Sequence, residues 1–498
     1  MISSHSQPTE LEQARLSTGV EGLDTVLSGG LIPNQTYLLR GGPGSGKTTL
    51  GLHFLTQATA AEPALLITLG EIEAKIRRNA QRLGFDLEFV HFLDLSPSAA
   101  FFTEDKSYDI FLPADVERES VTSQILTSVQ ALHPTRVFVD SITQFRYLSS
   151  DIYQFHQQML SFIRYLTDEG ATTLFTSEGS RENPDNDLQF MSDGVITLRA
   201  SSSGRTIQAE KFRGSSFIEG AHSMKLGPSG AVVFPQLKSD AFSRSYTPDV
   251  ISSGIAELDD LLHGGLERGT ITIVSGATGV GKTTFGAQFI KEGAKRGTRS
   301  VIYSFEESPD TILHRCEAIN MSVRQMIENQ TLQIDAVEAL SLTPDEFAQM
   351  VRHEVETRGT RVVMIDSLSG YRLAMRGDDM TPHIHALCRY LQNMGVTTLL
   401  INEIDNVTGD FQATGQQLSY LADNIIFLRY LEIDGQLRKA IGVLKKRLSG
   451  FESTLREFQV TRHGLKVGMP LSNLRGILNG IPEWVVPPSQ ASDQVDRG

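Results

Sequence analysis

Length, composition and charge limit the classes of protein to which this chain can belong. With 498 residues, 40% of them apolar and 21% charged, the sequence predicts two soluble globular domains of roughly 200–250 residues each. The formal net charge of −14, together with the lack of a long basic run, disfavours nucleic acid as a partner. No run approaches the ~18 apolar residues that cross a bilayer, and residues 1–17 lack the apolar core of a secretory signal, so we expect a cytoplasmic protein without membrane contact.

The first half of the chain alternates short apolar runs with amphipathic stretches. The runs TYLLR, ALLITL and RVFVD are typical of buried strands, and the stretch YQFHQQMLSFIRYLTDEG, which closes at Gly170, is typical of a helix. Strand and helix in alternation predict an α/β fold with a mainly parallel sheet flanked by helices.

The second half repeats the first. The segment STGVEGLDTVLSGGL recurs as SSGIAELDDLLHGGL, so that Ser252 stands 235 positions after Ser17. GGPGSGKTT recurs as GATGVGKTT at the same spacing, VFVDS as VMIDS, and SDGVITL as ADNIIFL. We therefore predict a duplicated domain. The expected boundaries are an amino-terminal tail at 1–10, a first domain at 11–235, a linker at 236–250, a second domain at 251–468 and a carboxyl-terminal tail at 469–498.

Each half carries a phosphate-binding loop of the form G-x-x-x-x-G-K-[ST]. A glycine-rich turn points backbone N–H groups at phosphate oxygens, and the following helix adds its positive end. Lys47 and Lys282 are expected to contact the β- and γ-phosphates of ATP, and the hydroxyls of Thr48 and Thr283 are expected to ligate Mg²⁺. The predicted loop residues are Gly41, Gly42, Pro43, Gly44, Ser45, Gly46, Lys47, Thr48 and Thr49 in the first half, and Gly276, Ala277, Thr278, Gly279, Val280, Gly281, Lys282, Thr283 and Thr284 in the second.

Carboxylates follow two strands of each predicted sheet. Asp140 and Asp366 end apolar strands, where the second acid of a magnesium site belongs; a helix-capping role is the alternative, since serine follows both. After the preceding strand the second half has Glu306 and Glu307, predicted to activate the attacking group, with Glu306 also near the metal. The first half has Gly70 and Glu71 there, so we expect domain one to bind ATP better than it cleaves it. Solvated turn residues are the other interpretation of these acids.

The double phosphate loop, the SxGxxxLDxxLxGG lead-in, the Glu-Glu pair and late K-x-R strands together resemble the KaiC family of clock ATPases and autokinases over roughly residues 15–485. The resemblance implies two RecA-like domains, a two-tiered homohexamer with ATP between subunits, Mg²⁺ as cofactor, and autophosphorylation by the second ring. It also implies a KaiB-like protein or another signalling protein as a further partner, and a role in circadian-type timing or signalling.

Further site residues come from this resemblance. EKFRGSS and LKKRLSG are similar to the strands that reach the neighbouring subunit's nucleotide, which implies Lys211, Arg213, Lys445 and Arg447 as trans contacts; a solvated strand face is the alternative. GDFQATGQQLSYLADNIIFL is similar to the phosphoacceptor loop, which implies Ser419 as acceptor, Tyr420 at the position of an acceptor threonine, and Thr414 as a nearby acceptor.

Two other functions remain open from the sequence. A DNA-dependent ATPase of RecA or RadA type would share the phosphate loops, but acidic charge and the serine-bearing loop argue against it. A nucleotide-gated signalling scaffold with little turnover would keep the fold, and Gly70 is compatible with that for domain one.

Overall fold

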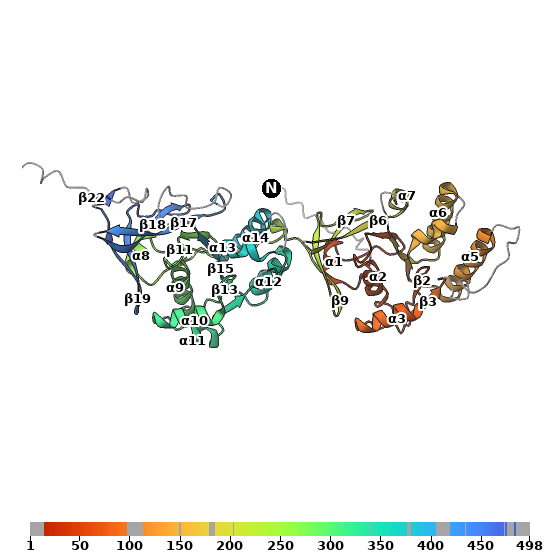
Figure 1. The fold of residues 1–498 in the computed structure, drawn as a ribbon, viewed down its shortest axis with the longest axis horizontal. Helices are drawn as coiled ribbons and strands as arrows, with labels where there is room; N and C mark the ends of the chain where they lie inside the picture. Colours follow the sequence, from red (N-terminus) through yellow and green to blue (C-terminus); the bar gives the residue numbers. More distant parts are fainter. Residues whose placement is uncertain are drawn as a thin grey trace, which may run out of the picture. The chain divides into compact units, whose positions relative to one another are not determined.

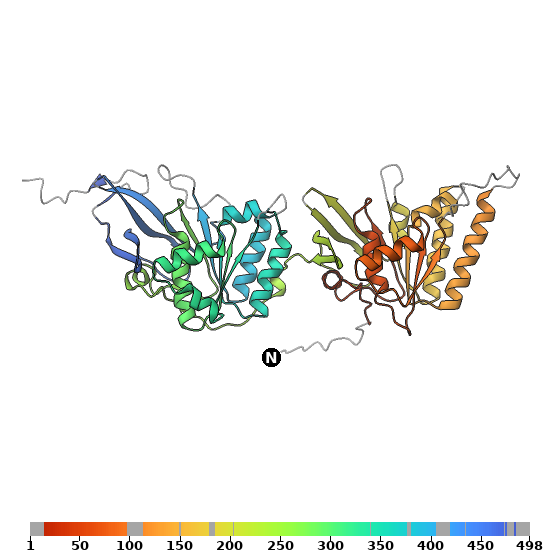
Figure 2. The ribbon, with the colours of Figure 1, turned by 60° about the horizontal axis from the view of Figure 1, so that its bottom comes forward.

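The computed structural model describes residues 14–96, 113–148, 151–178, 185–202, 204–338, 340–375, 380–404, 419–433, 435–472, 474–475 and 483–484, without the side chains of 113–120, of 147–148 and of the residues after 472. The chain divides into two compact units, Met1–Gln236 and Leu237–Gly498, and we describe each by itself. Figures 1 and 2 show that each unit is one sheet with helices on both of its faces.

The first unit is built on a nine-stranded sheet in the order β3-β2-β4-β5-β1-β6-β7-β8-β9. The pairings from β3 to β6 are parallel, and those from β6 to β9 are antiparallel. The strands are β1 (Thr36–Arg40), β2 (Ala64–Thr68), β3 (Val90–Asp94), β4 (Arg136–Asp140), β5 (Thr172–Ser177), β6 (Gly194–Ser201), β7 (Gly204–Phe212), β8 (His222–Gly227) and β9 (Gly230–Phe234).

Helices pack on both faces of this sheet because its central strands are apolar on both sides. One core joins α2 (Lys47–Leu55) and α3 (Glu73–Arg82) to the sheet, and a second core joins α5 (Pro113–Leu132) and α6 (Ile152–Asp168) to it. The shorter elements are α1 (Glu21–Val26), η1 (Ile142–Leu148) and α7 (Asn186–Met191).

The second unit repeats this plan with the strand order β14-β13-β15-β16-β12-β17-β18-β19-β20. Parallel pairing again runs from the first edge to β17, and antiparallel pairing follows it. The strands are β12 (Ile271–Gly276), β13 (Ser300–Ser304), β14 (Leu332–Ala336), β15 (Val362–Asp366), β16 (Thr397–Glu403), β17 (Asn424–Ile433), β18 (Gln436–Lys446), β19 (Arg456–Thr461) and β20 (Gly464–Pro470). The predicted duplicated α/β fold is confirmed.

The helices of the second unit also form two layers. One core contains α9 (Lys282–Lys295), α10 (Pro309–Ala318) and α11 (Val323–Glu328), and the other contains α12 (Pro344–Glu356), α13 (Leu368–Ala374) and α14 (Thr381–Asn393). The remaining elements are η2 (Ser239–Ala241), α8 (Ala256–Leu261), the pair β10 (Val250–Ile251) with β11 (Leu266–Glu267), and the pair β21 (Leu474–Arg475) with β22 (Glu483–Trp484). None of the helices in the described ranges combines the length and the apolar character needed to cross a membrane.

The segment predicted as a linker packs against the second unit. Leu237 and Phe242 contact the core formed by α12 and α14, and the Nδ2 atom of Asn393 donates to the carbonyl of Ser239 at 3.0 Å. Residues 237–246 therefore cover one face of the domain that follows them.

Candidate functional site

The two phosphate loops adopt the same turn. Gly46 and Gly281 immediately precede α2 and α9 with φ of 109° and 114°, values that favour glycine over any residue with a Cβ. Each loop leaves the carboxyl end of a central parallel strand, β1 or β12, and enters the amino terminus of a helix. Free N–H groups and the positive end of the helix dipole therefore point at one spot, where a phosphate would be stabilised.

The loop lysines lie inside these turns. The Nζ atom of Lys47 donates to the carbonyls of Gly41 and Gly42 at 2.7 and 3.1 Å, and that of Lys282 donates to the carbonyl of Ala277 at 2.9 Å. Both side chains are buried, and burial lowers the pKa of each ammonium below its ordinary value. Each ammonium is thus held where phosphate oxygens could take over from the backbone carbonyls.

A threonine and an aspartate meet beside each loop. The hydroxyl of Thr48 donates to the Oδ2 atom of Asp140 at 2.7 Å, and that of Thr283 donates to the Oδ2 atom of Asp366 at 2.7 Å. Burial raises the pKa of Asp366 to about 6. A hydroxyl and a half-buried carboxylate are oxygen ligands of the kind that Mg²⁺ takes alongside nucleotide phosphates, so this pair fits the cation.

The acids after the second strand sit in equivalent turns. The hydroxyl of Thr68 accepts from the backbone N–H of Glu71, and that of Ser304 accepts from the backbone N–H of Glu307, so Gly70 and Glu306 occupy matching positions. At Gly70 an added Cβ would meet one described atom within 4 Å, the Nε2 atom of Gln144 at 3.9 Å. The first domain thus has room for the side chain that it lacks.

The two glutamates of the second domain have different partners. Glu306 accepts a hydrogen bond from the hydroxyl of Ser367, which follows Asp366. Glu307 forms an ion pair of 2.6 Å with Arg315 on α10. Because the ion pair ties the carboxylate of Glu307 to α10, Glu306 is the better candidate for a general base. In the first domain, Glu71 pairs with exposed Lys75 at 2.7 Å.

A cavity of about 330 Å³ joins these residues in the second domain. Its lining includes side chains that the sequence reasoning missed, namely Glu403 at the end of β16, Lys439 on β18 and Arg315. In the first domain Glu178 lies 4.0 Å from Lys47. The matching ends of TTLFTSE and TTLLINE were the signal that could have found Glu178 and Glu403.

The K-x-R residues make matching contacts within their own domains. Lys211 donates to the carbonyl of Ser192 at 2.6 Å, and Lys445 donates to that of Ala422 at 2.6 Å. Arg213 lies 3.5 Å from Asp193, and Arg447 lies 3.2 Å from Asp423. Both arginines are more than half exposed, so their guanidinium groups are accessible to another molecule.

Two of the three predicted phosphoacceptors belong to the described residues. Ser419 offers its carbonyl to Lys445 at 3.2 Å. Tyr420 is 54% exposed, and its ring centroid lies 5.8 Å from that of His385. Thr414 lies outside the described residues.

The repeated fold and its paired phosphate sites match one family of proteins. The model of the KaiC ATPase domain matches the chain twice, at residues 16–238 and 251–472. The chain belongs to the KaiC family. Because the members of this family are ATPases, the chain is an ATPase that uses ATP.

Curated KaiC proteins resemble the chain over nearly its whole length. It is 27% identical to the circadian clock oscillator protein KaiC of Parasynechococcus marenigrum (strain WH8102), over 96% of this chain and 95% of that protein. It is also 27% identical to the KaiC proteins of Synechococcus elongatus, over 97% and 94%, and of Thermostichus vulcanus, over 96% and 94%. The likeness therefore includes both KaiC domains in order.

Proposed function

We propose that this chain is a hexameric ATPase whose second domain phosphorylates Ser419 of a neighbouring subunit. The observation that carries the proposal is the difference between the two nucleotide sites. Both have the buried lysine and the Thr–Asp pair, but the second alone has a carboxylate at the position of Glu306.

In this mechanism Ser419 is the nucleophile. Its Oγ atom forms a bond with the γ-phosphorus of ATP while the bond from that phosphorus to the β,γ-bridging oxygen breaks, and ADP leaves. The serine proton passes to the carboxylate of Glu306, whose contact with Ser367 orients it. General-base assistance of this kind is worth roughly 10²–10⁴-fold.

The remaining residues position the phosphates. Lys282 would exchange its bond to the carbonyl of Ala277 for bonds to the β- and γ-phosphates. Thr283 and Asp366 would hold Mg²⁺, which when bound neutralises charge on the phosphate oxygens. Because these groups are fixed before ATP binds, little reorganisation is needed during transfer.

The first domain is proposed chiefly to bind ATP and to drive assembly. Lys47, Thr48 and Asp140 supply the same nucleotide contacts as their counterparts in the second domain. Where the second domain has two glutamates after its second strand, the first domain has only Glu71. Since Glu71 is exposed and paired with Lys75, hydrolysis there should be slow.

A homohexamer is proposed because the accessible arginines, Arg213 and Arg447, and their neighbours Lys211 and Lys445 fit contacts to nucleotide held by another subunit. A cation that reaches a γ-phosphate across an interface stabilises developing charge. A KaiB-like protein or another signalling protein is proposed as a further partner, on the family likeness alone, and so is a role in timing.

Peptide mass spectrometry after incubation with Mg-ATP tests the kinase proposal. We expect phosphate on Ser419, a second and smaller share on Thr414 and little on Tyr420, whose hydroxyl reaches farther from the backbone than that of serine. Glu306→Gln should remove most of the signal. Phosphate chiefly on Tyr420, or an undiminished signal in Glu306→Gln, would contradict the mechanism.

A further inference from the structure

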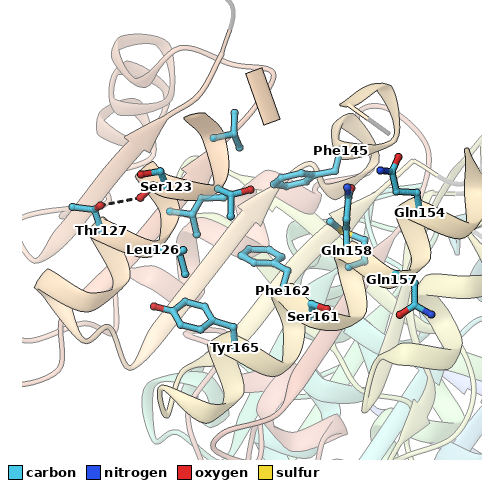
Figure 3. A pocket seen from close by; sticks show the side chains of 14 residues that line it. Ser123, Leu126, Thr127, Phe145, Gln154, Gln157, Gln158, Ser161, Phe162 and Tyr165 are labelled. Carbon is cyan, nitrogen blue, oxygen red and sulfur yellow. Dashed lines mark hydrogen bonds between the residues drawn. The ribbon is translucent and has the colours of Figure 1, made fainter. Parts of the chain in front are cut away.

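An apolar groove lies between α5 and α6 of the first domain. Figure 3 shows Leu126 of α5 and Phe162 and Tyr165 of α6 beside it, with Phe145 at its side. The groove encloses about 870 Å³, and no phosphate-loop residue lines it. Leu126 is 36% exposed, so within the described part of the chain this surface is only partly covered. The lining combines these apolar side chains with polar ones such as Gln154 and Gln158, so the groove is suited to a segment of chain that carries both kinds of residue.

The equivalent face of the second domain is covered by residues 237–246. The ring of Phe242 packs edge-on against Tyr390 of α14, with centroids 5.4 Å apart, and the guanidinium of Arg352 of α12 lies 4.3 Å above it. The backbone N–H of Arg244 donates to the carbonyl of Asn393 at 3.0 Å. The segment is therefore fixed by side chains and by backbone.

The two faces correspond residue by residue. Tyr165 is equivalent to Tyr390, because they precede Gly170 and Gly395 by five positions each. Leu126 is equivalent to Arg352, because they precede Asp140 and Asp366 by the same number of positions. At Gly395 an added Cβ would lie 2.4 Å from the ring of Tyr246. At Gly170 it would meet no described atom within 4 Å. The first domain thus lacks, among its described residues, a counterpart of both Phe242 and Tyr246.

The chain enters the two domains in the same way. Leu16 pairs with Leu31, and Ile251 pairs with Leu266, again 235 positions later. Counted back by that spacing, residues 237–246 correspond to residues 2–11. Ile2 then occupies the position equivalent to Leu237, and Leu11 the position equivalent to Tyr246. Gln7 is at the position equivalent to Phe242.

We propose that residues 2–11 dock in the groove between α5 and α6 of their own subunit, as residues 237–246 dock between α12 and α14. The connection has the length that such docking requires, because residues 12–15 separate Leu11 from Leu16 just as residues 247–250 separate Tyr246 from Ile251. Leu126 offers an apolar surface where the second domain offers Arg352. The amino-terminal segment would then be a structural part of the first domain.

Disulfide trapping in the full-length protein tests this proposal. The variant Gln7→Cys/Leu126→Cys joins the positions equivalent to Phe242 and Arg352. The two native cysteines, Cys316 and Cys388, are buried and leave the background clean. Phe242→Cys/Arg352→Cys is the positive control. Gln7→Cys/Tyr153→Cys is the matched control, since Tyr153 lies on α6, is 72% exposed and is outside the groove lining.

We expect mild oxidation to form an intramolecular disulfide in Gln7→Cys/Leu126→Cys several-fold faster than in the Tyr153 control, and urea to abolish the difference. Gln7→Phe should raise the melting temperature, and Gln7→Phe/Leu126→Asp should not. Disulfide-linked dimers at Leu126 would show that a second copy fills the groove. Equal rates at Leu126 and Tyr153 in the folded protein would show that the segment does not dock. Either result would overturn the proposal.

Discussion

The ammonium of Lys445 lies 3.2 Å from the carbonyl oxygen of Ser419, the proposed acceptor. No described carboxylate lies within ion-pair distance of this ammonium, and its second hydrogen bond is donated to the carbonyl of Ala422. The lysine proposed to reach a neighbouring nucleotide therefore also holds the backbone that presents the acceptor. Lys211 holds the carbonyls of Gln189 and Ser192 in the same way, at 2.9 and 2.6 Å, so the contact is a property of the repeated fold.

Removal of this contact should affect phosphorylation more than folding. We expect Lys445→Ala to reduce phosphate on Ser419 by about tenfold or more, because reacting groups lose rate steeply when their positioning is relaxed. Intact-mass measurement after incubation with Mg-ATP gives the phosphorylated fraction. Lys211→Ala, the matched change in the first domain, should leave that fraction nearly unchanged within assembled hexamers. Equal losses in both variants would contradict this role.

The two loop lysines should have separable effects. Lys282→Ala should abolish autophosphorylation, because this buried ammonium is the one proposed to bind the phosphates transferred in the second domain. Lys47→Ala should chiefly impair ATP-dependent assembly, seen as a smaller mass by light scattering. ATP that binds only the assembled form favours assembly by mass action. A wild-type protein that stays monomeric at saturating Mg-ATP would refute the hexamer.

Gly70→Glu should increase hydrolysis by the first domain. The backbone at Gly70 lies outside the positive φ region, and the nearest described atom to an added Cβ is 3.9 Å away, so the new side chain can be placed without strain. In a Glu306→Gln background, which silences the second site, we expect steady-state ATPase activity to rise by about tenfold or more. Gly70→Gln is the control, because it fills the same space without a proton acceptor. A rise of the same size in both variants would exclude a general base at this position.

The raised pKa of Asp366, about 6, predicts a pH dependence of nucleotide binding in the second domain. Its buried carboxyl binds a proton more readily in the folded than in the unfolded chain, so without nucleotide its contribution to stability is present at low pH and is lost as the pH rises through about 6. Mg-ATP requires the charged form, so binding near pH 6 should release a proton and should weaken below it. Calorimetry in buffers of different ionisation enthalpy measures this release. Asp366→Asn should abolish that part of the proton release.

The parts of the site that belong to recognisable sequence motifs could be predicted from the sequence. The phosphate loops, the strands before them and the acids at strand ends follow from spacing and apolar runs, and the structure brings Thr283 to Asp366 as expected. The contacts between distant elements could not be predicted, since they depend on how the layers pack. Glu403 of β16 and Lys439 of β18, for example, line the cavity around the second phosphate loop.

The packing of the linker could not be predicted from the sequence either. Residues 236–250 were predicted as a connection between domains, but the sequence did not show that Phe242 would pack between Tyr390 and Arg352. That contact depends on the spacing of α12 and α14. The internal sequence repeat, by contrast, predicted two domains of one fold, and both units have the same strand order.

Mixed hexamers test whether one subunit phosphorylates Ser419 of the next. Lys282→Ala subunits, which keep Ser419 but lack the catalytic lysine, are assembled with Ser419→Ala subunits and incubated with Mg-ATP. Intact-mass measurement distinguishes the two chains. We expect phosphate on the Lys282→Ala chain, which should be unmodified when assembled alone. A Lys282→Ala chain that stays unmodified in the mixture, while wild-type hexamers are phosphorylated, would contradict transfer between subunits.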